Sequence, residues 1–285
     1  MLPHNYLFEA IGTKWNIATA TEIDTSLKKV IQDRIETFDR TYSRFRSDSL
    51  VTRLAKKEGE YEFPKDAAPL FDFYKKLYEL TDGRMTPLIG EMLERAGYDA
   101  KYSLQAREQT SLPEWEDVME VKESLVRTRA RLTIDIGAAG KGYLVDIIAA
   151  LLNDAGYKEY VIDASGDFIH KGKSENRVGL EHPLQPGQVI GVVDVRNQSM
   201  CASASNRRAW GEGMHHIFDP TTKAPVKDVI ATWVIADQTM IADGLATALF
   251  FADPSLLAQY FEYQYVRMYH DGSLDYSYNF RGELF

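Results

Sequence analysis

The sequence predicts an α+β protein, and three observations lead to this fold class. Helix-like and strand-like segments occur in groups rather than in strict alternation, which argues against a doubly wound parallel sheet. Short segments rich in β-branched residues are bounded by turn residues, whereas longer segments carry apolar residues at spacings of three and four. With 285 residues and no internal repeat, the chain fits one large domain or two small ones, and we expect a single domain over residues 1–285.

The individual elements follow from apolar periodicity and from the residues that begin or end them. Proline in a first turn and glycine after a last turn mark helix ends. The expected helices are residues 25–45, 49–56, 66–81, 141–155, 240–251 and 254–263. The expected strands are residues 8–20, 131–136, 160–163, 189–195, 229–236, 265–269 and 274–280. Residues 87–123 are charged and irregular, and we assign no element there.

Composition excludes several classes of protein. A balance of 33 basic against 42 acidic side chains argues against a nucleic-acid-binding scaffold. Cys201 is the single cysteine, so no intrachain disulfide can form. No apolar run approaches the roughly 18 residues of a membrane span. Residues 1–14 lack the pattern of a signal peptide, which favours a cytoplasmic protein, with a removed export segment as the alternative.

A glycine-rich segment at residues 135–143, with the sequence DIGAAGKGY, is expected between a strand and a helix. Its small residues let a ligand approach the backbone, and the N–H groups at a helix N-terminus bind phosphate well. Lys141 adds a positive charge at this point. An ordinary tight turn explains the same spacing about equally well.

Two further segments combine turn residues with polar side chains. Residues 163–167, DASGD, follow a strand and place two carboxylates around small residues, although a plain turn has the same composition. His215 and His216 precede an Asp-Pro turn at residues 219–220. Neighbouring side chains of an extended segment point to opposite faces, so at most one histidine faces a site. A packed histidine before a turn is the alternative.

Asp243 and Thr247 are four residues apart, which places them on one face of the helix expected over residues 240–251. A carboxylate and a hydroxyl are hard oxygen ligands that suit Mg²⁺. One carboxylate holds Mg²⁺ weakly, so the phosphates of a ligand would have to complete the coordination. The alternative is that Asp243 caps its own helix and that Thr247 bonds back to the carbonyl of residue 243.

In this order the four segments resemble the motifs of the FAD:protein FMN transferase family, the ApbE-like proteins. Residues 135–146 resemble the family's DxGxxAKGYxxD, and residues 163–167 resemble its NAGGD. Residues 216–222 resemble its HIxDPxT, and residues 242–250 match its ADALATALF almost letter for letter. The resemblance extends to the N-terminal part of the chain, at residues 12–13, 42–45 and 83–90.

The resemblance implies an ApbE-like fold, related to the T-fold, with mixed or antiparallel sheets packed against helices. It also implies Mg²⁺-dependent transfer of FMN from FAD to a threonine hydroxyl of an acceptor flavoprotein, with release of AMP. The Mg²⁺ ligands would be the side chains of Asp243 and Thr247 and the carbonyl of Ala138. The residues expected to contact FAD are Tyr42, Met85, Asp135, Lys141, Gly166 and His216.

Three residues are candidates for the base that accepts the proton of the incoming hydroxyl: Asp135, Asp167 and His216. The residues alone do not choose among them. Two other functions remain open beside the transferase. The same site could hydrolyse FAD to FMN and AMP, or the protein could bind FAD without catalysis.

Overall fold

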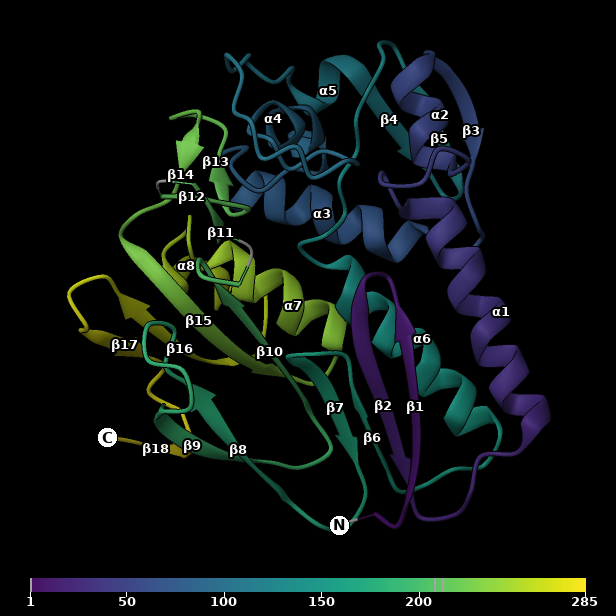
Figure 1. Cartoon of the computed structure of the whole chain (residues 1–285), viewed down its shortest axis with the longest axis vertical. Helices are drawn as coiled ribbons and strands as arrows, with labels where there is room; N and C mark the ends of the chain where they lie inside the picture. The colour runs from purple at the N-terminus through teal and green to yellow at the C-terminus, as the bar shows by residue number, and fades with distance from the viewer. Residues whose placement is uncertain (1, 208, 212) are drawn as a thin grey trace. The chain divides into compact units, whose positions relative to one another are not determined.

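The fold is α+β, as the sequence predicts, and the computed structural model describes residues 2–207, 209–211 and 213–285 (Figure 1). The chain divides into two compact units, each assembled from separate stretches of sequence. Unit 1 consists of Met1–Ile35, Ala139–Arg207 and Lys227–Phe285, and unit 2 of Glu36–Ala138 and Arg208–Val226. That the whole chain acts as one domain stays a prediction.

Unit 1 is built on an eight-stranded sheet in which every neighbouring pair of strands is antiparallel. In order across the sheet the strands are β1 (His4–Ala10), β2 (Thr13–Thr19), β6 (Tyr160–Asp163), β7 (Asp167–Lys171), β10 (Ser199–Ala204), β15 (Val229–Ala236), β16 (Gln264–Tyr269) and β17 (Leu274–Tyr276). The N-terminal hairpin therefore pairs with strands from the middle of the sequence, and the last strands complete the opposite edge.

The two faces of this sheet carry different layers (Figure 1). On β10, Ser199, Cys201 and Ser203 point toward α7 (Thr239–Ala248), which lies beside α6 (Gly140–Asp154). The alternate residues, such as Met200, pack into a core shared with a second, three-stranded sheet. That sheet has the order β18 (Gly282–Leu284), β9 (Val189–Val195) and β8 (Asn176–Glu181). All eight residues of β15 are buried because both of its faces are covered.

Unit 2 combines short helices with small sheets. Its helical elements are the end of α1 (Thr25–Tyr42), α2 (Leu50–Lys56), α3 (Ala68–Leu80), the 3₁₀ turn η1 (Pro87–Ile89), α4 (Gly90–Arg95) and α5 (Trp115–Val118). Its three-stranded sheet has the order β3 (Gly59–Glu62), β5 (Leu125–Thr128) and β4 (Met119–Lys122). Two small hairpins pair β11 (Ala209–Trp210) with β12 (Met214–His215) and β13 (Phe218–Asp219) with β14 (Ala224–Pro225).

Two strand predictions were wrong. The strand expected over residues 8–20 is a hairpin, because Ile11 (φ 44°) and Gly12 (φ 74°) form a tight turn between β1 and β2. Residues 131–136 form no strand. Leu132 and Asp135 instead donate single backbone bonds to the carbonyls of Leu54 (3.2 Å) and Pro87 (2.8 Å). The apolar alternation that predicted a strand reflects alternate burial of an extended segment.

The remaining predictions agree more closely with the structure. Strands β6, β9 and β15 have the predicted bounds, and α6 differs by one residue at each end. The last predicted helix is shorter than expected, because α8 covers only Pro254–Leu257. None of the helices within residues 2–207, 209–211 and 213–285 combines the length and the hydropathy that a membrane span requires.

Candidate functional site

Helices α6 and α7 of unit 1 are joined by hydrogen bonds at their N-terminal ends. The Oδ2 atom of Asp243, inside α7, accepts a hydrogen bond from the backbone N–H of Gly142 at 2.9 Å. Gly142 is in the first turn of α6, where an N–H group has no acceptor within its own helix. A Cβ atom on Gly142 would lie 2.3 Å from the carbonyl oxygen of Thr239, so the close approach requires glycine.

A second carboxylate makes the reverse connection. Asp146 of α6 accepts bonds from the backbone N–H groups of Thr239 (2.9 Å) and Met240 (2.8 Å), which begin α7. Gln238, the residue before α7, provides no side-chain cap. Burial raises the pKa of Asp146, while the bonds from Met240 and Thr239 act in the opposite direction. Each helix therefore supplies a carboxylate to the N-terminus of the other.

The alternative reading of Asp243 as a cap of its own helix was wrong, since its carboxylate bonds to α6. Thr247 lies one turn further along α7, and its Oγ1 atom is 3.3 Å from Oγ of Ser203 on β10. Thr239 is tied to the same strand through its Oγ1 atom, 2.8 Å from Oγ of Ser199. Two hydroxyl pairs thus hold α7 against β10, and Thr247 is partly exposed.

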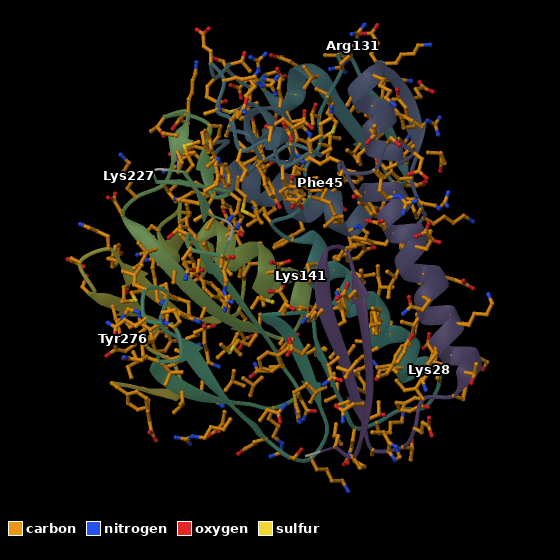
Figure 2. The ribbon with its side chains drawn as sticks, in the orientation of Figure 1. Lys28, Phe45, Arg131, Lys141, Lys227 and Tyr276 are labelled. Carbon is orange, nitrogen blue, oxygen red and sulfur yellow. The ribbon has the colours of Figure 1, made fainter. Side chains whose placement is uncertain are left out.

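Lys141 joins the start of α6 to the turn between β6 and β7 (Figure 2 labels this side chain). Its Nζ atom is 3.0 Å from Oδ2 of Asp167 and donates to the carbonyls of Ala164 (3.0 Å) and Ser165 (3.3 Å). Burial opposes the charged form, but Asp167 and Asp243 outweigh it and raise the pKa of Lys141. The predicted phosphate-binding lysine therefore also holds a protein turn in place.

Residues 163–167, the DASGD segment, form a tight turn between β6 and β7. Ser165 has φ 58° and Gly166 φ 105°, so both adopt backbone conformations typical of turns. Gly166 is exposed, and nothing lies within 4 Å of the position that a Cβ atom would take. Asp167 is 1% exposed, so its carboxylate is buried beside the Lys141 ammonium.

In unit 2, Asp135 is held by Arg44, a residue to which the sequence assigned no role. The Nε atom of Arg44 is 2.5 Å from Oδ2 of Asp135, and the backbone N–H of Gly137 donates to Oδ1 at 2.7 Å. The Arg44 side chain is 3% exposed, and its guanidinium lies 4.2 Å from the ring centre of Phe45. These contacts fix the position of the Asp135 carboxylate.

The other predicted residues of unit 2 lie in different surroundings. Tyr42, at the end of α1, is 3% exposed and packs against the rings of Phe38 and Phe63. Met85 is buried in the turn after α3. Ala138 is partly exposed at the boundary of the unit.

The two adjacent histidines differ as the extended-segment argument predicts. His215, on β12, is buried, its Nε2 donates to the carbonyl of Val226 at 2.9 Å, and its Nδ1 accepts from the N–H of Ile217. Burial lowers the pKa of His215. His216 is partly exposed, so it is the more exposed of the two histidines. Asp219 has a structural role, since its Oδ1 accepts bonds from the N–H and hydroxyl of Thr221.

Half of the predicted site residues belong to unit 1 and half to unit 2. Two polar residues that contact them had no predicted role, namely Arg44 and Ser203. Asp146, also without a predicted role, caps the helix that carries Asp243 and Thr247. Within residues 2–207, 209–211 and 213–285, no three His, Cys, Asp or Glu side chains form a cluster that could hold a metal by itself. A metal at Asp243 and Thr247 would need further oxygens from its ligand.

Comparison with known proteins identifies the family. The sequence model of the ApbE family matches residues 11–269, so the chain belongs to the ApbE family. Curated relatives carry the name FAD:protein FMN transferase. One from Klebsiella pneumoniae is 22% identical over 92% of this chain and 82% of its own length. One from Escherichia coli is 23% identical over 86% of this chain and 77% of its own.

Solved structures agree with the fold. The ApbE protein of Thermotoga maritima aligns with a TM-score of 0.84 at 19% identity, over 96% of this chain and 97% of that one. The flavin transferase ApbE of Vibrio cholerae aligns with a TM-score of 0.79 at 20% identity, over 96% of both chains. The family and the fold class predicted from the sequence are therefore confirmed.

Proposed function

We propose that this chain is an FAD:protein FMN transferase, which moves the FMN part of FAD to a hydroxyl group of an acceptor protein and releases AMP. Membership of the ApbE family and the shared name of relatives that align over most of their length support this function. The finer part of the proposal is that the reaction depends on Mg²⁺ and that the acceptor hydroxyl belongs to a threonine.

The observation that carries the metal proposal is the fixed position of Asp243. Its Oδ2 is held by the N–H of Gly142, and Thr247 follows one helical turn later with its hydroxyl beside Ser203. Two hard oxygens on one helix suit Mg²⁺ when phosphate oxygens complete the coordination. In our proposal Asp243, Thr247 and the carbonyl of Ala138 hold the ion. Bound Mg²⁺ would neutralise charge that develops on the pyrophosphate.

The proposed transfer needs no reactant other than FAD and the acceptor hydroxyl. The acceptor hydroxyl oxygen forms a bond to the phosphorus of the FMN half, the bond between this phosphorus and the bridging oxygen breaks, and AMP leaves with that oxygen. A base takes the hydroxyl proton, and Asp135, Asp167 and His216 remain the candidates. Among them, Asp135 is paired with the guanidinium of Arg44, and Asp167 with the ammonium of Lys141. His216 is the more exposed of the two adjacent histidines.

The test is to incubate the protein with FAD, Mg²⁺ and an acceptor flavoprotein domain that carries a threonine, using its Thr→Val variant as the matched acceptor. We expect AMP by chromatography and, by mass spectrometry, FMN attached only to the threonine form. AMP without a modified acceptor would show a hydrolase. Bound FAD with neither product would show a binding protein and contradict the proposal.

The metal assignment is tested by Asp243→Ala. This variant should lose Mg²⁺-dependent AMP release, whereas Asp237→Ala should retain it, because Asp237 is an exposed residue after β15. Unchanged turnover in Asp243→Ala would show that the metal binds elsewhere.

A further inference from the structure

The start of α7 depends on a side chain from another helix. The first N–H groups of a helix have no acceptor within the helix and are commonly satisfied by the side chain of the preceding residue. Gln238 makes no such bond. Asp146 of α6 supplies both acceptors instead, with one oxygen at 2.9 Å from the N–H of Thr239 and the other at 2.8 Å from that of Met240.

The two interhelical connections form a reciprocal pair. Gly142 and Asp146 are four residues apart on α6, and Thr239 and Asp243 are four residues apart on α7. Gly142 bonds to Asp243, and Asp146 bonds to Thr239. Residues at this spacing lie one above the other on a helix face, so the crossed pairing indicates that α6 and α7 run antiparallel at this point. Two bonds one turn apart restrict both sliding and rotation of α7.

We infer that Asp146 is a positioning residue for the metal pair Asp243 and Thr247, an inference that rests on the function proposed above. Asp146 fixes the first turn of α7, and the next turn carries Asp243. The bond from Gly142 then sets the orientation of the Asp243 carboxylate. Each Asp146 oxygen accepts a backbone N–H, so the residue acts through α7 and not on the reacting atoms.

The metal-free protein gives the first test. We expect Asp146→Ala to increase hydrogen–deuterium exchange at the amides of Thr239 and Met240 and also at Gly142, whose acceptor is carried by α7. Asp146→Asn, which keeps one acceptor oxygen, should have a smaller effect. The control is Asp154→Asn, the same change at an exposed residue of α6. Faster exchange at Thr239 and Met240 with no change at Gly142 would overturn the inference.

The second test measures how AMP release from FAD depends on Mg²⁺ concentration. Loss of a residue that orients a metal ligand commonly weakens metal affinity by 10–100-fold, so Asp146→Ala should raise the half-saturating Mg²⁺ concentration by roughly 10-fold. At saturating Mg²⁺, turnover should recover most of the wild-type value. A lower maximal rate with an unchanged half-saturating concentration would contradict a positioning role.

These experiments distinguish a failure of the proposed transferase function from a failure of the positioning role of Asp146. If the wild-type protein releases no AMP, the proposed function fails, whereas the exchange measurement still tests the link from Asp146 to Gly142. If the wild type is active and Asp146→Ala has the wild-type Mg²⁺ dependence, only the positioning role fails. A thermal unfolding curve for each variant identifies any that does not fold, and Asp146→Asn then replaces Asp146→Ala.

Discussion

The carboxylate of Asp243 accepts a hydrogen bond from the backbone N–H of Gly142, although the two residues are 101 positions apart in the sequence. The bond joins the two segments in which the family resemblance is most evident, the glycine-rich turn and the helix with the predicted metal ligands. It explains why a glycine is required at the start of α6, since any Cβ atom there would collide with α7.

Gly142→Ala should therefore destabilise the protein. The added Cβ would lie 2.3 Å from the Thr239 carbonyl oxygen and 2.7 Å from Cβ of Asp243, and overpacking of this kind costs about 1–3 kcal/mol. Urea denaturation would measure the change in the free energy of unfolding. Gly156→Ala is the comparison, because its Cβ would meet nothing within 4 Å and only its positive φ is unfavourable. Equal losses of unfolding free energy in the two variants would show that α6 and α7 move apart to accommodate the added Cβ at no cost.

Lys141→Met should destabilise the fold more than a surface lysine substitution does. The variant leaves the Asp167 carboxylate, which is 2% exposed, without its cation, and breaking a buried ion pair costs about 3–5 kcal/mol. Lys29→Met is the control, since Lys29 forms an exposed pair with Asp33. Both free energies of unfolding can be obtained from urea curves at neutral pH. A loss no larger than that of the control would mean that solvent reaches Asp167.

Arg44→Lys should not behave as a conservative change. Lysine keeps the charge but loses the planar guanidinium that bonds to Asp135 and stacks on Phe45. We expect a lower melting temperature and weaker FAD binding, measured by thermal unfolding and by fluorescence titration. The same change at Arg40, an exposed residue of α1, should alter neither. If Arg44→Lys binds FAD with wild-type affinity, the pair of Arg44 and Asp135 does not contribute to FAD binding.

Stability should fall at alkaline pH because of buried tyrosines. Burial raises the pKa of Tyr160 from 10.0 to about 12, so the folded protein keeps the phenol proton over a range in which the unfolded chain loses it. The contribution is constant below pH 10 and is lost as the pH rises from 10 toward 12. Tyr160→Phe should show a shallower decline in unfolding free energy over this range than wild type. Tyr278→Phe, at a fully exposed position, should follow the wild-type curve.

Local periodicity was sufficient to predict several strands with their correct bounds. The bounds of β6, β9 and β15 were correct because continuous or alternating apolar residues end at turn residues. Strand β10 was missed because its sequence, SMCASA, has small and polar residues on the face that meets α7. Residues 131–136 were assigned wrongly, since burial alternates there without a partner strand.

The candidate site shows the same division between local and long-range information. The spacing of Asp243 and Thr247 placed them on one helix face, and the structure has both on α7. No local pattern could indicate that Asp146 caps α7 or that Arg44 holds Asp135, because 93 and 91 residues separate these partners. Such contacts depend on how the elements meet. The motif resemblance contained both residues without revealing what they do.

The strand order of unit 1 has a consequence for synthesis on the ribosome. The N-terminal hairpin β1–β2 is translated early, but its sheet neighbour β6 follows only after about a hundred residues of unit 2. The buried strand β15, which joins β10 to β16, emerges later still. Helix α7, which contacts both α6 and β10, follows β15. Until it emerges, the face of α6 that it covers stays open, so the nascent chain should depend on chaperones during this interval.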